Sequence, residues 1–190
     1  MNNDTVCASD DIAFRIDELQ LDLGEGPCWE AFASRRPVLV PDVRAGPHAE
    51  WPVFGEAVQQ TPAQALFAFP LYVGWTGVGA LDLYCTTPGE LDDGALHDAA
   101  ALAATIATEL LRRILDSNDR SGPGNDVWHD WPQDRRQVHQ ATGMLIDQLD
   151  LPVGAAFARL RAHAFATGAT VADLARDVVS GRLRFAPERQ

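Results

Sequence analysis

The residues best suited to catalysis or metal binding are scattered along this chain of 190 residues. Cys7, Cys28 and Cys85 have neither the spacing of metal ligands nor that of a disulfide framework. The five histidines are equally dispersed, and no nucleophile lies beside a base in the sequence. The sequence therefore predicts no enzyme, no catalytic set, no metal site and no cofactor, with the cysteines as small buried side chains.

Arginine side chains offer a second kind of chemistry, the binding of nucleic acid. The chain has fifteen basic residues, all of them arginine. In the C-terminal third, several polar side chains fall outside the apolar faces of predicted helices. They are Arg135, Arg136, Gln140, Thr142, Arg161, His163 and Arg176. Arginine stacks on unpaired bases and donates hydrogen bonds to them, so these residues suit the recognition of RNA loops. Each could equally be an ordinary solvated surface residue.

Three short helices must position these residues. Apolar residues recur at three- and four-residue steps and predict helices at about 133–149, 153–166 and 170–180. The apolar faces comprise Val138, Ala141, Leu145, Leu149, Ala156, Phe157, Leu160, Ala164, Val171, Leu174, Ala175 and Val178. Leu151-Pro152 and Gly168 separate the helices, and Thr170 with Asp173 predicts a capping box. Helices this short need to pack together, as a structural bundle or a binding module.

Three blocks in this region resemble the ANTAR domain, the RNA-binding module of bacterial transcription antitermination regulators. They are Gln140-Ala141-Thr142-Gly143-Met144-Leu145, Ala156-Phe157-x-x-Leu160-Arg161-x-x-Ala164 and Val171-x-x-Leu174-Ala175. The resemblance implies that residues 131–190 form a three-helix domain that binds hairpins of a leader transcript. Thr142 stands where many members carry a lysine, which removes a cation from a position expected to face RNA.

A linker rich in Ser, Gly, Pro and Asn precedes this region, at residues 118–130. Trp128, His129 and Trp131 lie beside it, and we expect them to dock on one of the domains. The net charge of −12 belongs to residues 1–117, whereas residues 118–190 are neutral. This acidity argues against a general binder of polyanions, so we expect weak or conditional RNA binding by the full chain.

Residues 1–117 show the pattern of an α+β domain. Short helices are expected at about 10–21 and 29–33, and a short edge strand at 36–42 between two prolines. Apolar runs at 65–73 and 78–84 predict a β-hairpin with its loop at 74–77. On the second strand, alternation places Gly79, Leu81 and Leu83 on one face and Val78, Ala80, Asp82 and Tyr84 on the other.

Several blocks of this part resemble a GAF domain. They are Leu23-Gly24-Glu25-Gly26-Pro27-Cys28, Pro37-Val38-x-Val40-x-Asp42, Trp51-Pro52, Ala68-Phe69-Pro70-Leu71 and residues 78–84. The resemblance implies an antiparallel sheet between helices, a possible small-molecule ligand and dimerisation through terminal helices. The chain starts after the helix and strands with which such domains usually begin, so we expect a partial sheet whose open edge a second protomer covers.

The longest predicted helix, Asp92–Asp116, is the expected dimer contact. Two rows of residues spaced by seven, Leu96/Ala103/Leu110 and Ala100/Ala107/Ile114, form a seam for a partner helix or for the chain's own sheet.

Together, these patterns predict a cytoplasmic regulator that binds RNA hairpins to control transcription antitermination. No stretch is long and apolar enough for a membrane span, so we expect no membrane partner. Two alternatives stay open. One is a dimeric sensor or protein-interaction module without RNA binding, and the other is a DNA-binding helix-turn-helix regulator, which the acidic residues of the third helix disfavour.

Overall fold

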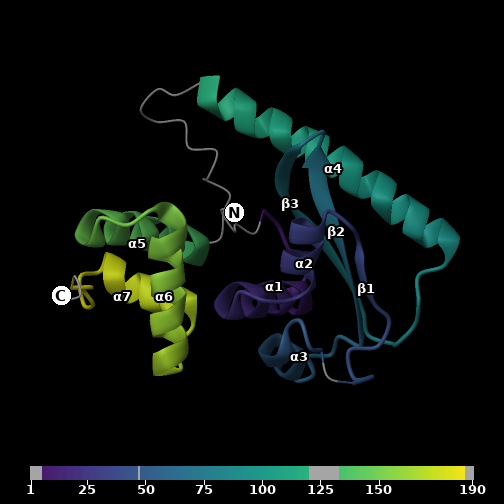
Figure 1. The fold of residues 1–190 in the computed structure, drawn as a ribbon, viewed down its shortest axis with the longest axis horizontal. Helices are drawn as coiled ribbons and strands as arrows, with labels where there is room; N and C mark the ends of the chain where they lie inside the picture. The colour runs from purple at the N-terminus through teal and green to yellow at the C-terminus, as the bar shows by residue number, and fades with distance from the viewer. Residues whose placement is uncertain (1–5, 47, 120–132, 187–190) are drawn as a thin grey trace. The chain divides into compact units, whose positions relative to one another are not determined.

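The computed structural model describes residues 6–46, 48–119 and 133–186. These residues form two compact units, each described by itself below: a sheet with its helices, and a bundle of three helices (Figure 1). The expected α+β class, with an antiparallel sheet followed by a helical C-terminal region, is confirmed.

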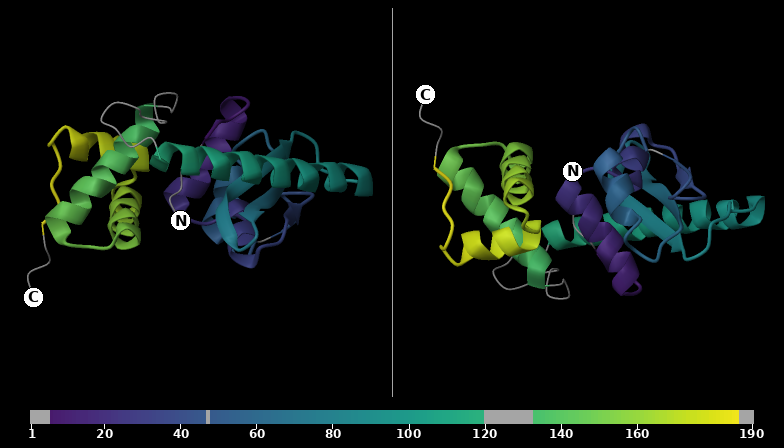
Figure 2. Two further views of the ribbon diagram at one scale, coloured as in Figure 1. Left: turned by 90° about the horizontal axis from the view of Figure 1, so that it is seen from above. Right: turned by 90° about the horizontal axis from the view of Figure 1, so that it is seen from below.

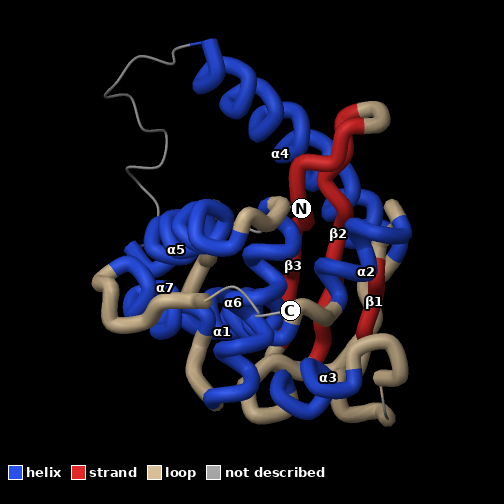
Figure 3. The backbone as a smooth tube through the Cα atoms, turned by 60° about the vertical axis from the view of Figure 1, so that its left-hand side comes forward, coloured by secondary structure: helices blue, strands red, loops and turns tan. Residues whose placement is uncertain are grey.

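The described sheet has three antiparallel strands in the order β1-β2-β3. Their bounds are β1 Val38–Val40, β2 Ala65–Val73 and β3 Thr76–Cys85. Figure 3 shows the long β2–β3 hairpin in red with the short β1 beside it. β1 pairs with Leu66, Phe67 and Ala68 alone, so the second half of β2 has no described neighbour on that side. The hairpin and the short edge strand thus occur where the sequence predicted them.

One face of the sheet is covered by α4 (Asp93–Asp119), which runs along it (Figures 1 and 2). Alternate residues of β2 point to this side, as the pleat of a strand requires. The buried residues are Ala65, Phe67, Phe69 and Leu71 from β2 and Ala99, Ala103 and Ala107 from α4. The alanines let the helix axis approach the sheet closely.

The opposite face carries α1 (Asp11–Leu23) and α2 (Pro27–Ser34), with α3 (Pro52–Val58) beyond them. The side chain of Asp10 accepts a hydrogen bond from the backbone N–H of Ala13 at 2.9 Å and caps α1. Gly24, at φ 66°, ends the helix in the left-handed conformation that glycine tolerates best. Pro27 begins α2 at a helix position that tolerates proline.

A bulge in the hairpin changes the face on which Val78 lies. Leu71 pairs with Gly79 and Tyr72 with Gly77, so Val78 is an extra residue on β3. Val78 packs on the α4 side together with the leucines of β3. Its predicted position on the opposite face is therefore wrong, because simple alternation cannot register an extra residue.

The bundle contains α5 (Gln133–Leu149), α6 (Val153–Thr167) and α7 (Val171–Val179). The buried core contains the apolar positions expected from the sequence, with Leu149 and Phe157 partly buried at its border. Gly168 ends α6 at φ 67°, and the Thr170 hydroxyl oxygen accepts a hydrogen bond from the N–H of Asp173 at 3.0 Å. The predicted breaks and the predicted cap are thus present.

Helix α4 differs from its expected bounds. It continues to Asp119, so the first two residues of the predicted linker are helical, and Trp128, His129 and Trp131 lie outside the described residues. Most of the predicted seam packs on the chain's own sheet, since Leu96, Ala103, Ala107 and Leu110 belong to the α4-side core.

Among the described residues, no helix is long and apolar enough to cross a membrane, and no three potential metal ligands gather. Cys28 is buried, as expected for a small apolar side chain, but Cys7 and Cys85 are exposed, which the sequence analysis did not predict.

Candidate nucleic-acid interface

Helix α5 presents a polar stripe on its exposed side. The stripe consists of Arg136, Gln140, Gly143 and Asp147, which recur at four- and three-residue steps and are all exposed. Arg136 and Gln140 are one turn apart, so the structure brings these two predicted residues together. Neither forms a hydrogen bond or an ion pair with another described residue. The stripe thus offers a cation and an amide that are available to a ligand.

Thr142 lies on the other side of α5. Only 7% of the residue is exposed, and its hydroxyl donates a hydrogen bond to the carbonyl oxygen of Val138 at 2.8 Å. This geometry favours a role in packing over contact with a ligand. The backbone of Arg135 belongs to the first turn of α5, but its side chain lies outside the described residues.

Arg161 and His163 lie on α6, two residues apart, so they point to different sides of the helix. Both are half-buried. The His163 ring packs edge-on against Phe185, with 5.1 Å between ring centroids. Phe165 follows on the same side as Arg161 and is 66% exposed. A cation next to an exposed ring is the combination on which an unstacked base can lie.

Arg176 lies on α7 and is paired within the helix. Its Nη1 donates to Asp173 Oδ1 at 2.6 Å. Beyond the helix, Arg182 donates two hydrogen bonds to the carboxylate of Asp177. The cations at α7 are thus neutralised by neighbouring acids, unlike Arg136.

Two residues of this surface were not among the predicted binding residues. An ideal Cβ at Gly143 would meet no atom within 4 Å, so no contact in the bundle requires a glycine there. A glycine inside a helix is destabilising relative to alanine, which makes its presence in the exposed stripe notable. Phe165 was missed because helical periodicity favoured the buried positions of α6, and an unburied aromatic has no signal of its own.

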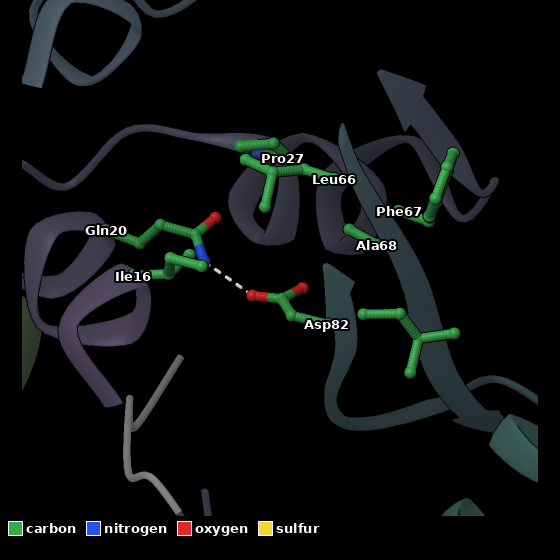
Figure 4. Close-up of a pocket in the computed structure, with 8 residues that line it drawn as sticks. Ile16, Gln20, Pro27, Leu66, Phe67, Ala68 and Asp82 are labelled. Atoms are coloured by element: carbon green, nitrogen blue, oxygen red, sulfur yellow. Dashed lines mark hydrogen bonds between the residues drawn. The ribbon is translucent and has the colours of Figure 1, made fainter. Parts of the chain in front are cut away.

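The sheet unit contains a closed polar contact beneath α1. Gln20 is 1% exposed, and its Nε2 donates a hydrogen bond to Asp82 on β3 (Figure 4). Its Oε1 accepts from the backbone N–H of Cys28 at 2.8 Å. A Cβ at Gly26 would come within 2.8 Å of the same amide. Gln20 thus fills the space between α1, α2 and the sheet, and leaves no room for a ligand there.

The surroundings of Asp82 favour its neutral form. Burial of the carboxyl raises its pKa to about 7, the carboxylate of Asp17 adds to the rise, and the hydrogen bond from Gln20 opposes it. Asp82 lies on the outer strand of the sheet, and the residue keeps an exposed side. Water on that side stabilises the carboxylate, so the pKa stays below the value that complete burial would give.

The two units match two known families. Residues 2–110 match the family model of the GAF domain, which is more than half of the chain, and residues 132–179 match the model of the ANTAR domain. The protein belongs to the GAF domain family and carries an ANTAR domain. The stripe of α5, Thr142, Arg161, His163, Phe165 and Arg176 all lie within the ANTAR match, and the Gln20–Asp82 contact lies within the GAF match.

Part of the chain is also similar to solved structures of free methionine-R-sulfoxide reductases. The type II enzyme of Thermoplasma acidophilum is 19% identical, with a TM-score of 0.36, over 46% of this chain and 57% of that one. The Staphylococcus aureus enzyme in its reduced form is 20% identical, with a TM-score of 0.37, over 46% and 53%. The Neisseria meningitidis enzyme, in complex with its substrate, is 25% identical, with a TM-score of 0.35, over 48% and 52%.

The chain thus spans little more than half the length of each reductase, and TM-scores this low carry no argument about its activity. No curated protein matches the chain.

Proposed function

We propose that the protein is a cytoplasmic regulator whose ANTAR domain binds RNA hairpins in leader transcripts and thereby controls transcription antitermination. The observation that carries this proposal is the exposed α5 stripe within the ANTAR match, where Arg136 and Gln140 lie one turn apart and neither is paired with another described residue. An arginine and an amide side by side supply a phosphate contact and a base-edge contact. The GAF domain is the signal-responsive part.

The distribution of ion pairs favours RNA over DNA. In a helix-turn-helix protein the last of the three helices would enter the major groove. Helix α7 carries Asp173 and Asp177, which hold Arg176 and Arg182 in ion pairs. Its carboxylates would face phosphates, whereas α5 offers Arg136, which no described carboxylate pairs.

We place the homodimer contact on the outer face of α4. The residues on that face include Thr108, Leu111 and Leu115. Thr108 and Leu115 are seven residues apart, which is the spacing of a coiled-coil seam. Leu115 is 57% exposed. The double variant Leu111→Glu/Leu115→Glu should therefore sediment as a monomer; an unchanged mass would show that α4 is not the contact.

The test of RNA binding uses the full chain and a double-hairpin leader RNA across a salt series. We expect affinity to depend on loop sequence and to fall as salt rises. The double variant Arg135→Glu/Arg136→Glu should lose about tenfold to a hundredfold in affinity per arginine, at unchanged helix content. The control is Arg36→Glu in the GAF domain, which makes the same change in charge per substituted arginine at an exposed position.

Wild-type affinity in the double variant would overturn the role of α5. Absence of any binding at low salt would favour the remaining alternative, a dimeric sensor that acts through protein contacts alone.

A further inference from the structure

A cavity of about 340 Å³ lies at the outer edge of β2, away from the Gln20–Asp82 contact. It forms where β1 has ended, so the edge of β2 from Phe69 onward is uncovered by a described strand. Its lining includes Pro37, Phe69 and Pro70, the Arg35 side chain beside Tyr72, and Ala100 and Ala104 of α4. The cavity is therefore mainly apolar and contains one cation.

The Arg35 guanidinium is held between two aromatic rings. Its Cζ lies 4.9 Å from the centroid of Tyr72 and 5.4 Å from that of Trp75, within the range of cation–π contact. The Tyr72 hydroxyl donates a hydrogen bond to the carbonyl oxygen of Phe32 at 2.9 Å, which fixes the ring. Arg35 forms no ion pair with a described carboxylate, even though the protein is strongly acidic. Its charge is positioned but not neutralised.

The backbone at Arg35 is also unusual. Arg35 follows α2 with φ 58° and ψ 29°, the left-handed conformation in which helices usually place glycine. A side chain in this conformation is strained, and such strain is a reason to look for a functional use of the residue. Trp75 is a second indication of a functional role, since it is 86% exposed at the tip of the hairpin and contacts Arg35.

We propose that this cavity binds a small organic anion in which a carboxylate is attached to a flat aromatic ring. The carboxylate would accept hydrogen bonds from Arg35, and the ring would lie against Pro37, Pro70 and the alanines of α4. The volume falls near the lower end of the roughly 300–1,000 Å³ of small-molecule sites, so it suits a compact ligand. Inorganic phosphate would make no contact with the apolar lining of the cavity, whereas a neutral ring would leave the guanidinium of Arg35 without an anionic partner.

This site goes beyond RNA binding, because its residues belong to the GAF domain and its test needs no RNA. The position of the cavity also suggests how a bound ligand would affect the rest of the protein. One wall belongs to α4, the helix that leads toward the ANTAR domain in the sequence. A ligand that fills the cavity contacts that helix directly.

The experiment is calorimetric titration of the full chain with benzoate and with benzamide, its neutral counterpart. We expect benzoate to bind with a dissociation constant on the order of 1 mM and benzamide to bind about tenfold more weakly or less. Arg35→Gly should lose about tenfold in benzoate affinity, since a charged hydrogen bond is removed. It should fold at least as well as the wild type, because glycine relieves the strained backbone.

Two further variants make the test specific. Arg36→Gln removes the neighbouring exposed arginine and should bind benzoate as the wild type does. Ala104→Phe fills the cavity from the α4 side without changing charge and should abolish binding. The proposal is overturned if benzoate gives no signal at about 10 mM, if benzamide binds as well, or if Arg35→Gly retains affinity. A change of oligomeric mass in Arg35→Gly would also overturn it, by showing that the arginine serves a contact between copies.

Discussion

Gly143 provides the sharpest test of the α5 surface, because stability and binding should respond to its replacement in opposite directions. Alanine at this position would place its methyl group in open space, with no atom within 4 Å. The substitution therefore removes the helix penalty of glycine and adds no strain. We expect Gly143→Ala to stabilise the ANTAR domain by about 0.5–1 kcal/mol. For a domain of this size, this raises the unfolding temperature by roughly 2–8 °C.

The same methyl group should weaken RNA binding. Gly143 is one turn from Gln140 along the exposed stripe, so an RNA that contacts Arg136 and Gln140 passes close to the bare backbone. A methyl group there displaces the RNA and lengthens the neighbouring hydrogen bonds. Loss of one such contact corresponds to about 1–3 kcal/mol, or roughly tenfold to a hundredfold in affinity.

The assay combines differential scanning calorimetry of the full chain with RNA titration at fixed salt. Gly154→Ala is the matched control, since Gly154 is also helical and also meets no atom within 4 Å, but lies in the first turn of α6. It should raise stability and leave RNA affinity unchanged. If Gly143→Ala is more stable and binds RNA as tightly as the wild type, the RNA does not approach this side of α5. If it is less stable, the position is not an open helical site.

Two further predictions concern Asp82 and Thr142. The raised pKa of Asp82 means that the folded state keeps this carboxyl protonated where the unfolded state does not, so its contribution to stability is present at low pH and lost between about pH 4 and 7. Asp82→Asn should remove this loss; full desolvation would correspond to about 4 kcal/mol, and the exposed side of the carboxyl reduces it to about 1–2 kcal/mol. Urea unfolding of both proteins from pH 5 to 8 checks this, and a constant difference would refute it. Thr142→Val replaces a buried hydroxyl by a methyl group of similar size and should change stability by less than about 1 kcal/mol while leaving RNA affinity intact. A clear loss of affinity would instead make Thr142 an RNA contact.

The sequence predicted the bundle well because its signals are local. Buried positions recur at helical steps, and Thr170 and Gly168 mark helix ends by their own chemistry. The hairpin of the GAF domain was equally visible from two apolar runs. Its bulge was not, because an extra residue such as Val78 is defined by pairing with another strand and not by its neighbours in the chain.

The two candidate sites, the α5 stripe and the Arg35 cavity, also differ in how far apart their residues lie in the sequence. Arg136 and Gln140 could be placed on one side of a helix from spacing alone. The Arg35 site could not be predicted, because it joins the end of α2, a strand edge and α4, which are far apart in sequence. Neither the left-handed backbone of Arg35 nor the exposure of Trp75 has a pattern in the sequence.

Thr142 offers a physical reason for expecting RNA binding to be conditional. The resemblance to the ANTAR domain leads one to expect a lysine at that position, and a lysine could extend from the bundle border with its charge in water. Threonine instead turns its hydroxyl to the backbone of Val138 and completes the packing of α5. The exposed stripe is left with Arg136, while the guanidinium of Arg176 is engaged by Asp173. With one cation in the stripe and an acidic GAF domain in the same chain, we expect a small electrostatic gain on binding. Affinity must then come mainly from base contacts, which demand the correct loops and a favourable presentation of the domain. Such a protein is poorly suited to bind RNA indiscriminately and well suited to bind it only when a signal permits.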